Sequence, residues 1–207
     1  MKESMRNALV LVIITLVAGF ILGGVYELTK DTIAARQEED KKAAYVSVFN
    51  DADNFTAYDG FNADEVRSYL DSNGYASETI NEVLVACDTA GNKLGYAFNV
   101  TTSEGYGGDI TFTVGIKNDG TVNGVSILEI NETAGLGMNA EKVLIPQFAG
   151  KQVPLFAYTK TGSTSDNEID AISGATITTN AFVNGVNCCL KYFENIGGGS
   201  NEQMDRE

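Results

Sequence analysis

The segment 109–117 reads Asp-Ile-Thr-Phe-Thr-Val-Gly-Ile-Lys, with an apolar side chain at every second position. Such alternation is typical of a β-strand that buries one face. The buried face would carry Ile110, Phe112, Val114 and Ile116. The turn Asp119-Gly120 follows, and a second β-rich run extends over 122–130. Because Asp-Gly between two apolar runs is a strong hairpin signal, this stretch predicts an antiparallel sheet.

Working outward, the sequence predicts two further strands and several helices. The runs 82–88 and 94–101 flank the turn 90–92 and form a second predicted hairpin. The other expected elements are a helix capped by Asn62 and ending near Ser72, a helix from about 139 to 149, a short strand over 153–158, and a helix that ends near Ile196. The predicted fold class is therefore α+β, with an antiparallel or mixed sheet packed with helices.

An apolar segment precedes this domain. Residues 8–26 contain no charged side chain and are rich in Leu, Val and Ile. As a helix they would span about 28 Å, close to the hydrocarbon thickness of a bilayer. Lys2 and Arg6 come before the segment, so the positive-inside rule predicts a cytoplasmic N-terminus and a domain on the outer face, periplasmic or extracellular. We expect one transmembrane helix in the inner (cytoplasmic) membrane.

A cleaved signal peptide is the alternative interpretation of the same segment. Its apolar core would usually be about 7–15 residues long and would be followed by a small-x-small cleavage site. The segment here is longer, and the sequence after it favours an uncleaved signal-anchor. The chain then divides into 1–26 (cytoplasmic N-terminus and transmembrane helix), 27–80 (stalk helix and a short helical segment), 81–196 (main domain) and 197–207 (disordered tail).

Composition excludes several classes of function. The formal net charge is −14, which argues against a nucleic-acid partner, since phosphate binding needs a basic surface. The chain has no His and three Cys, and its adjacent Cys188 and Cys189 form no Cys-x-x-Cys pattern. Haem, zinc and iron–sulfur sites therefore lack their usual ligands, and no metal site is expected. If this chain carries electrons, the carrier would be an organic cofactor.

Residues 170–176 read Asp-Ala-Ile-Ser-Gly-Ala-Thr and stand just ahead of the last predicted helix, which we expect to begin at Thr178 or Thr179. Ser, Gly and Ala have little bulk, so a large group can approach the backbone. A helix N-terminus has free N–H groups and partial positive charge, which suit a phosphate. The hydroxyl of Thr176 could therefore be esterified by a phosphate. An ordinary Ser/Thr-rich turn explains the same residues, so both interpretations stay open here.

Two glycine-rich stretches precede this motif. They are Gly105-Tyr106-Gly107-Gly108 and Glu132-Thr133-Ala134-Gly135-Leu136-Gly137. Together with 170–176 they resemble the FMN-binding domain family of membrane redox complexes. Their order and spacing are similar to those of the G subunit of the Rnf electron-transport complex, over roughly 83–193. Ala134 and Asn131 stand where that family often has Pro and His, which bears on loop rigidity but not on the attachment residue.

The resemblance implies one FMN per chain, joined through its phosphate to Thr176 as a phosphodiester. A separate flavin transferase that uses FAD and magnesium would make this bond. The implied cofactor-binding residues are Thr176, Ser173, Gly174, Ala175, Asp170, Glu132, Thr133, Leu136, Gly137, Tyr106 and Gly107.

The resemblance also implies roles for some of these side chains. Leu136 would pack on the flavin ring, and Tyr106 would stack or hydrogen-bond near it. Asp170 would orient its loop, cap a turn, or offer a ligand to the magnesium of the transferase. Glu132 and Thr133 would hold their loop or touch the polar edge of the flavin.

By the same resemblance the chain is a membrane-anchored electron carrier within a larger complex. That complex would couple electron transfer from ferredoxin to NAD to the export of Na⁺ or H⁺, with the other subunits as partners of this chain. The chain would supply one carrier and would not catalyse the reaction alone. Two alternatives stay open: the C subunit of the Na⁺-pumping NADH:quinone oxidoreductase, and a membrane-tethered binding or structural module without a redox role.

Overall fold

The computed structural model of this protein describes residues 2–197. Of the predicted tail over 197–207, all but Gly197 lies outside the described residues. The chain forms two compact units, with the division between Lys42 and Ala43.

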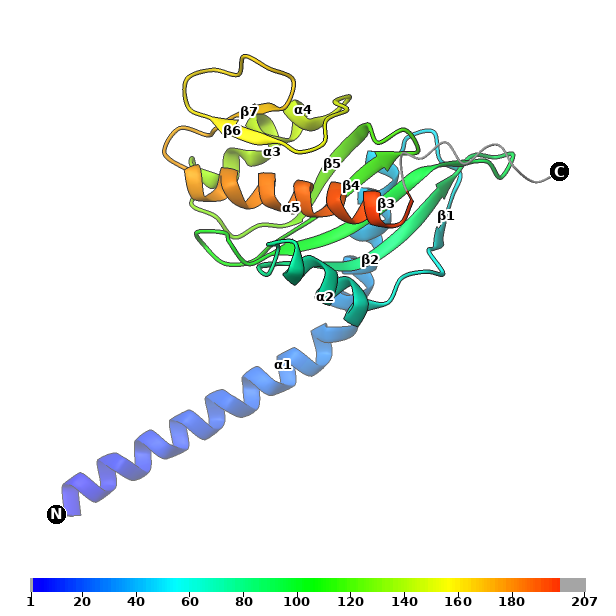
Figure 1. Ribbon diagram of the computed structural model, residues 1–207. Helices are drawn as coiled ribbons and strands as arrows, with labels where there is room; N and C mark the ends of the chain where they lie inside the picture. Colours follow the sequence, from blue (N-terminus) through cyan, green and yellow to red (C-terminus); the bar gives the residue numbers. More distant parts are fainter. Residues whose placement is uncertain (1, 198–207) are drawn as a thin grey trace. The chain divides into compact units, whose positions relative to one another are not determined.

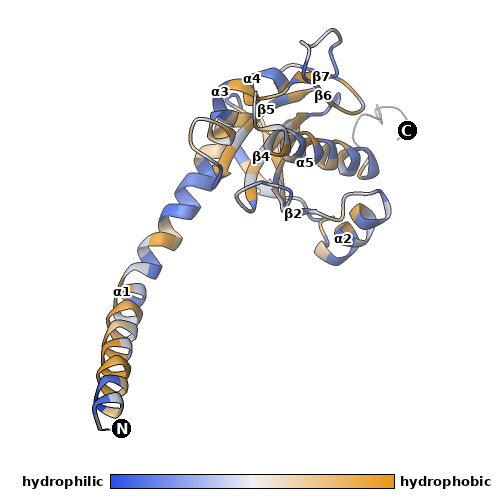
Figure 2. Ribbon diagram, turned by 90° about the vertical axis from the view of Figure 1, so that its left-hand side faces the viewer, coloured by the Kyte–Doolittle hydropathy of each residue, from blue (hydrophilic) through white to orange (hydrophobic). Residues whose placement is uncertain are grey.

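The first unit is helical. Helix α1 runs from Lys2 to Val48, so residues 43–48 belong to the second unit. Its N-terminal part is exposed, and it is long and apolar enough to cross a membrane. Figure 2 shows this part in hydrophobic colours, followed by hydrophilic turns. Among those turns an ion pair of 3.1 Å joins Arg36 to Glu39. The predicted long apolar helix at the N-terminus is confirmed.

The second unit is built on an antiparallel sheet with the strand order β1-β2-β3-β4-β5 within the described residues (Figure 1). The strands are β1 (Asn54–Ala57), β2 (Glu78–Cys87), β3 (Lys93–Thr102), β4 (Ile110–Lys117) and β5 (Val122–Glu129). The four predicted strands are present, although β2 begins four residues earlier than expected. The edge strand β1 escapes prediction because its sequence, Asn-Phe-Thr-Ala, is too short to show alternation.

Helix α5 (Thr176–Asn195) covers one face of this sheet (Figure 1). The ring of Phe182 in α5 lies 4.9 Å from the ring of Phe112 in β4, measured between centroids. Gly185 permits this approach, because a Cβ there would lie 2.5 Å from Cζ of Phe112. The four predicted core positions of β4 are fully buried on this face, namely Ile110, Phe112, Val114 and Ile116. The strand face predicted from alternation is confirmed.

The end of α1 covers the opposite face. Val48 and Phe49 are 1% exposed and pack with Tyr45 in a second apolar cluster over the sheet. Gly115 on β4 makes room for them, since a Cβ there would lie 2.9 Å from Cβ of Val48. The side-chain amide of Asn123 donates to the Val48 carbonyl at 2.5 Å. The last turns of α1 are thus part of the core of the second unit.

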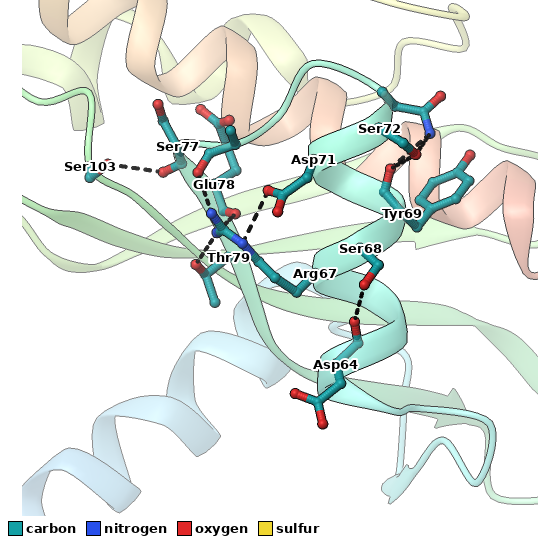
Figure 3. A network of polar contacts seen from close by, with 12 residues as sticks. Asp64, Arg67, Ser68, Tyr69, Asp71, Ser72, Ser77, Glu78, Thr79 and Ser103 are labelled. Carbon is teal, nitrogen blue, oxygen red and sulfur yellow. Dashed lines mark hydrogen bonds and ion pairs between the residues drawn. The ribbon is translucent and has the colours of Figure 1, made fainter.

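Helix α2 (Ala63–Ser72) begins as predicted, because the Asn62 side chain accepts backbone N–H bonds from its first turn. Arg67 ties this helix to the start of β2 (Figure 3). Its guanidinium donates to the carbonyl of Ala76 at 2.7 Å and to that of Glu78 at 3.2 Å. These bonds fix the turn that leads from α2 into the sheet.

The sequence predicts one continuous helix over 139–149, and this prediction is wrong because the helix is interrupted. The structure has a 3₁₀ turn at Gly137–Asn139, helix α3 at Ala140–Val143 and helix α4 at Ile145–Phe148. Pro146 lies in the first turn of α4, where its ring and its missing N–H prevent one continuous helix.

The strand predicted over 153–158 is displaced. Strand β6 covers Ala157–Thr159 and pairs in parallel with an unpredicted strand, β7, at Glu168–Asp170. Residues before Ala157 stay out of the strand because the Phe156 N–H donates to the side chain of Asn187 in α5, at 2.7 Å. With these corrections the architecture is α+β, an antiparallel sheet packed with helices, and the predicted fold class is confirmed.

Candidate functional site

The site is built around the start of α5. The N–H of Ala175 donates to the carbonyl of Ile172 at 3.0 Å and closes a tight turn. Gly174 lies inside this turn with φ of +79°, a conformation that glycine adopts without strain. The helix begins immediately afterwards, at Thr176. The turn therefore presents Ser173 and Gly174 to solvent directly before the first helical residue.

The prediction that α5 starts at Thr178 or Thr179 is wrong by two or three residues. Thr179 Oγ1 accepts the Ile172 N–H at 3.1 Å and donates to the Ala175 carbonyl at 2.9 Å. This hydroxyl holds the preceding turn from inside the helix, so it does not act as an N-cap. The N-cap position belongs to Ala175, which has no polar side chain.

Thr176 consequently occupies the first position of a 20-residue helix and is half-buried. The first-turn N–H groups of such a helix lack intrahelical partners. No side-chain hydrogen bond caps them from the Ala175 position within the described chain. A phosphate on the Thr176 hydroxyl would find N–H donors and the positive end of the helix dipole beside it.

The first glycine stretch is joined to the second by Glu132. The N–H of Gly107 donates to Glu132 Oε1 at 3.2 Å. Side chains would not fit at Gly105 and Gly107, because a Cβ on Gly107 would lie 1.9 Å from the Asn131 carbonyl and one on Gly105 would lie 2.1 Å from the Gly108 carbonyl. The backbones of the two stretches are therefore in direct contact.

The second stretch in turn meets the start of α5. A Cβ on Gly137 would lie 2.7 Å from Glu132 Oε2 and from Thr178 Oγ1, so this glycine allows the two segments to touch. A Cβ on Gly174 would lie 3.2 Å from Cδ2 of Leu136. The structure thus brings together three motifs that are separated by up to 71 positions in the chain, from Gly105 to Thr176.

Other predicted residues lie near this junction without joining its contacts. Tyr106 is 71% exposed, and Thr133 is exposed and offers its backbone carbonyl to Leu136 N–H at 3.1 Å. Asp170 Oδ1 accepts the Ser163 N–H at 2.5 Å, which orders the loop between β6 and β7. Among the roles considered for Asp170, the bond to Ser163 supports the one in which it orients its own loop.

Sequence reasoning misses three neighbours of the site. Met138 is 45% exposed and Ile177 is 52% exposed; Met138 follows Leu136, which is 40% exposed, by two positions, and Ile177 follows Thr176 directly. Exposed apolar side chains in segments that meet at a site are candidates for a binding surface. Glu104 is the third, and its Oε2 accepts amide bonds from Asn180 and Asn184 on α5. Its position directly before the glycine stretch is the signal that could have found it.

The site fits a flavin mononucleotide on three counts. Its helix start suits a phosphate, and its glycines let the loops and the helix start approach one another closely. Its exposed apolar side chains suit one side of a ring system.

Two family models match the sequence. Residues 105–191 match the FMN-binding domain, and residues 1–48 match the RnfG N-terminal region. The first match begins at the first glycine stretch and includes Thr176. The chain therefore contains an FMN-binding domain that coincides with the junction described above.

Curated relatives extend the likeness over nearly the whole chain. The G subunit of the Na⁺-translocating ferredoxin:NAD⁺ oxidoreductase complex of Acetobacterium woodii is 30% identical, over 94% of each chain. The G subunit of the proton-translocating ferredoxin:NAD⁺ oxidoreductase complex of Clostridium ljungdahlii is also 30% identical, over 91% of each chain. The crystal structure of Shewanella oneidensis NqrC is 21% identical with a TM-score of 0.46, over 54% of this chain and 57% of that chain, a likeness too slight to decide anything. On the strength of the full-length relatives, this chain belongs to the family of G subunits of ion-translocating oxidoreductase complexes.

Proposed function

We propose that this protein is a membrane-anchored electron-carrier subunit that holds one FMN covalently, through a phosphodiester to Oγ1 of Thr176. The observation that carries the proposal is the convergence of three motifs at the start of α5. Glu132 bonds the Gly107 N–H, and Leu136 reaches Gly174. These contacts support the proposal because they hold both glycine stretches beside the helix start that suits a phosphate.

The chain's own residues bind, orient and shield the cofactor. Thr176 provides the attachment oxygen, and the first-turn N–H groups of α5 bind the phosphate. The small residues Ser173, Gly174 and Ala175 let the cofactor lie close to the backbone. The bound flavin supplies the ability to accept and release electrons.

The remaining predicted residues line the space beside this attachment point. Leu136 packs on the ring together with Met138 and Ile177, and excludes water from it. Tyr106 and Gly107 approach from the first glycine stretch, and Thr133 and Gly137 from the second. Glu132 holds the two stretches together.

Attachment of the flavin requires a separate flavin transferase that uses FAD and magnesium. A threonine hydroxyl is a weak nucleophile and needs an activating group. The chain has no His, the usual general base at neutral pH. Asp170 keeps the loop before the motif in place while the transferase binds it, as its bond to Ser163 suggests.

The complex to which we assign this chain couples electron transfer between ferredoxin and NAD to ion export. The relatives named for Na⁺ and for protons are equally similar to this chain, so the exported ion is Na⁺ or H⁺. This chain carries electrons for its partner subunits and does not catalyse the overall reaction alone.

We further propose a single-pass topology with a cytoplasmic N-terminus. Residues 1–26 provide the N-terminus and the membrane helix, and 27–80 provide the stalk, α2 and the part of the second unit that includes β1 and the start of β2. Residues 81–196 form the FMN-binding domain on the outer face, periplasmic or extracellular. The apolar part of α1 supports the membrane span, and Lys2 and Arg6 support the orientation.

A denaturing gel viewed under ultraviolet light tests the attachment. Protein co-expressed with a flavin transferase should show a fluorescent band after denaturation, because only a covalent flavin survives this treatment. Thr176→Ala should abolish the fluorescence while the protein stain stays unchanged. A fluorescent Thr176→Ala band would show that the flavin is attached to another residue. A dark wild-type band with an active transferase present would favour a tethered module without a redox role.

A further inference from the structure

Two carboxylates contribute to the position of the first glycine stretch. Glu132 accepts the Gly107 N–H. Glu104, directly before Gly105, accepts hydrogen bonds from α5. The stretch is therefore fixed between the second glycine stretch and the helix that carries Thr176.

The bonds of Glu104 are specific to one face of α5. Its Oε2 accepts the side-chain amide of Asn180 at 3.0 Å and that of Asn184 at 2.7 Å. Residues four apart lie on the same face of a helix, so Asn180 and Asn184 share a face with Thr176. Glu104 thus joins the glycine stretch to α5 one helical turn away from the attachment residue, on the same side.

The backbone of Glu104 is anchored as well. Its N–H donates to Thr102 Oγ1 at 3.3 Å, and Thr102 Oγ1 donates to Glu78 Oε1 at 3.2 Å. Thr102 and Glu78 are buried at the end of the sheet, with exposed fractions of 0% and 1%. Glu104 therefore connects a rigid end of the sheet to the glycine stretch and to α5.

We propose that Glu104 is a positioning residue of the flavin site, which fixes the Gly105–Gly108 stretch against the face of α5 that carries Thr176. The proposal rests on the proposed function, because it assigns Glu104 to the flavin environment. Its physical basis is a single acceptor oxygen that bonds side chains on two successive turns of α5. Loss of both bonds should release the stretch, whereas a neutral acceptor of the same shape should largely retain it.

Hydrogen exchange of the full-length protein tests the positioning without any flavin. In a Thr176→Val background, Glu104→Ala should speed exchange of the peptide covering 103–109 about tenfold or more, as expected from the loss of hydrogen bonds to a charged group. Glu104→Gln should stay near wild type, because its amide oxygen can still accept. The double variant Asn180→Ala/Asn184→Ala removes the same bonds from the helix side and should match Glu104→Ala.

Asp88→Ala is the matched control. The Asp88 carboxylate likewise accepts several hydrogen bonds, from Ala90 and Asn92, but at the opposite end of β3 from Glu104. That strand is ten residues long, which corresponds to about 33 Å. The control should speed exchange of its own turn and leave 103–109 unchanged.

The visible circular dichroism of the flavinylated proteins then tests the link to the cofactor. The bands of the flavin should change in Glu104→Ala and in the double asparagine variant, and stay as in wild type in Glu104→Gln and Asp88→Ala. Unchanged exchange of 103–109 in Glu104→Ala, or faster exchange with unchanged flavin bands, would each overturn the proposal. A wild-type protein that carries no flavin at all would instead refute the proposed function. It would also refute the assignment of Glu104 to a flavin site.

Discussion

At the residue scale, Glu78 is a buried acid whose ionisation opposes folding. It is 1% exposed and bonded to Thr102. Burial first, and the nearby charge of Glu104 second, raise the pKa of Glu78 to about 6 from its ordinary value of 4.5. The folded state therefore holds this proton more tightly than the unfolded chain between pH 4.5 and 6.

The contribution of Glu78 to the free energy of unfolding should consequently fall by about 2 kcal/mol as pH rises from 4.5 to 6, because one pKa unit corresponds to about 1.4 kcal/mol. Glu78→Gln should remove this part of the pH dependence and raise stability above pH 6. Urea unfolding of both proteins at pH 4.5 and pH 7 measures the difference. Parallel pH profiles for the two proteins would contradict the assignment.

The role of Cys188 and Cys189 also follows from the surroundings of their side chains. Both are buried and free in α5, and burial raises the pKa of each thiol. A thiol held in its protonated form is a poor nucleophile. These residues therefore contribute to packing.

At the element scale, the contact between the second glycine stretch and α5 depends on Gly137. A Cβ there would come within 2.7 Å of Glu132 Oε2 and Thr178 Oγ1. Gly137→Ala should cost about 1–3 kcal/mol of stability and lower the flavin content, because the loop or the helix start must shift. Gly124→Ala is the control, since its Cβ would meet Cα of Val48 at an ordinary 3.5 Å.

Denaturant unfolding and the ratio of flavin to protein absorbance measure these two effects. An alanine at 137 that leaves both quantities at the wild-type level would show that the close approach is unimportant. A loss of similar size in Gly124→Ala would show that the effect is not specific to the site.

The elements that the sequence predicts are those with a strong local pattern. Strand β4 alternates over its whole length, and Asn62 caps α2 as expected. The start of α5 is predicted two or three residues too late because the Thr179 hydroxyl accepts a hydrogen bond from the Ile172 N–H. Local helix propensity does not predict this bond. Strand β7 is missed because it has only three residues and each pairs with a residue of β6 that lies eleven positions earlier in the chain.

The sequence predicts the candidate site in part, as it predicts the fold in part. The motif residues are found from resemblance, and the structure brings most of them together. The partners Glu104, Asn180 and Asn184 are not found, because their contacts span 76 and 80 positions in the sequence. Long-range pairs of this kind have no local signal.

At the scale of the whole molecule, α1 has two roles along its length. Its apolar N-terminal part can cross a membrane, and its end, with Tyr45 and Val48, belongs to the core of the second unit together with Phe49. A chain that begins at residue 27 should be soluble and keep the stability of its domain. A chain that begins at residue 50 should lose about 5 kcal/mol or more, since each buried large side chain contributes about 1.5–3 kcal/mol.

Membrane fractionation and thermal unfolding of the two shortened chains test this division. Equal stability of both chains would contradict the role given to the end of α1. Retention of the chain from residue 27 in the membrane fraction would contradict the role given to its N-terminal part.

The covalent flavin on Thr176 is the central claim, and intact mass with fragment mapping tests it most directly. Full-length protein from cells that contain a flavin transferase should gain the mass of one FMN less one water, located on the peptide with Thr176. Thr176→Val should gain nothing, while Ser173→Ala, which removes the exposed hydroxyl in the same turn, should still gain one FMN. An unmodified wild-type mass, or a flavin that remains on Thr176→Val, would contradict the account.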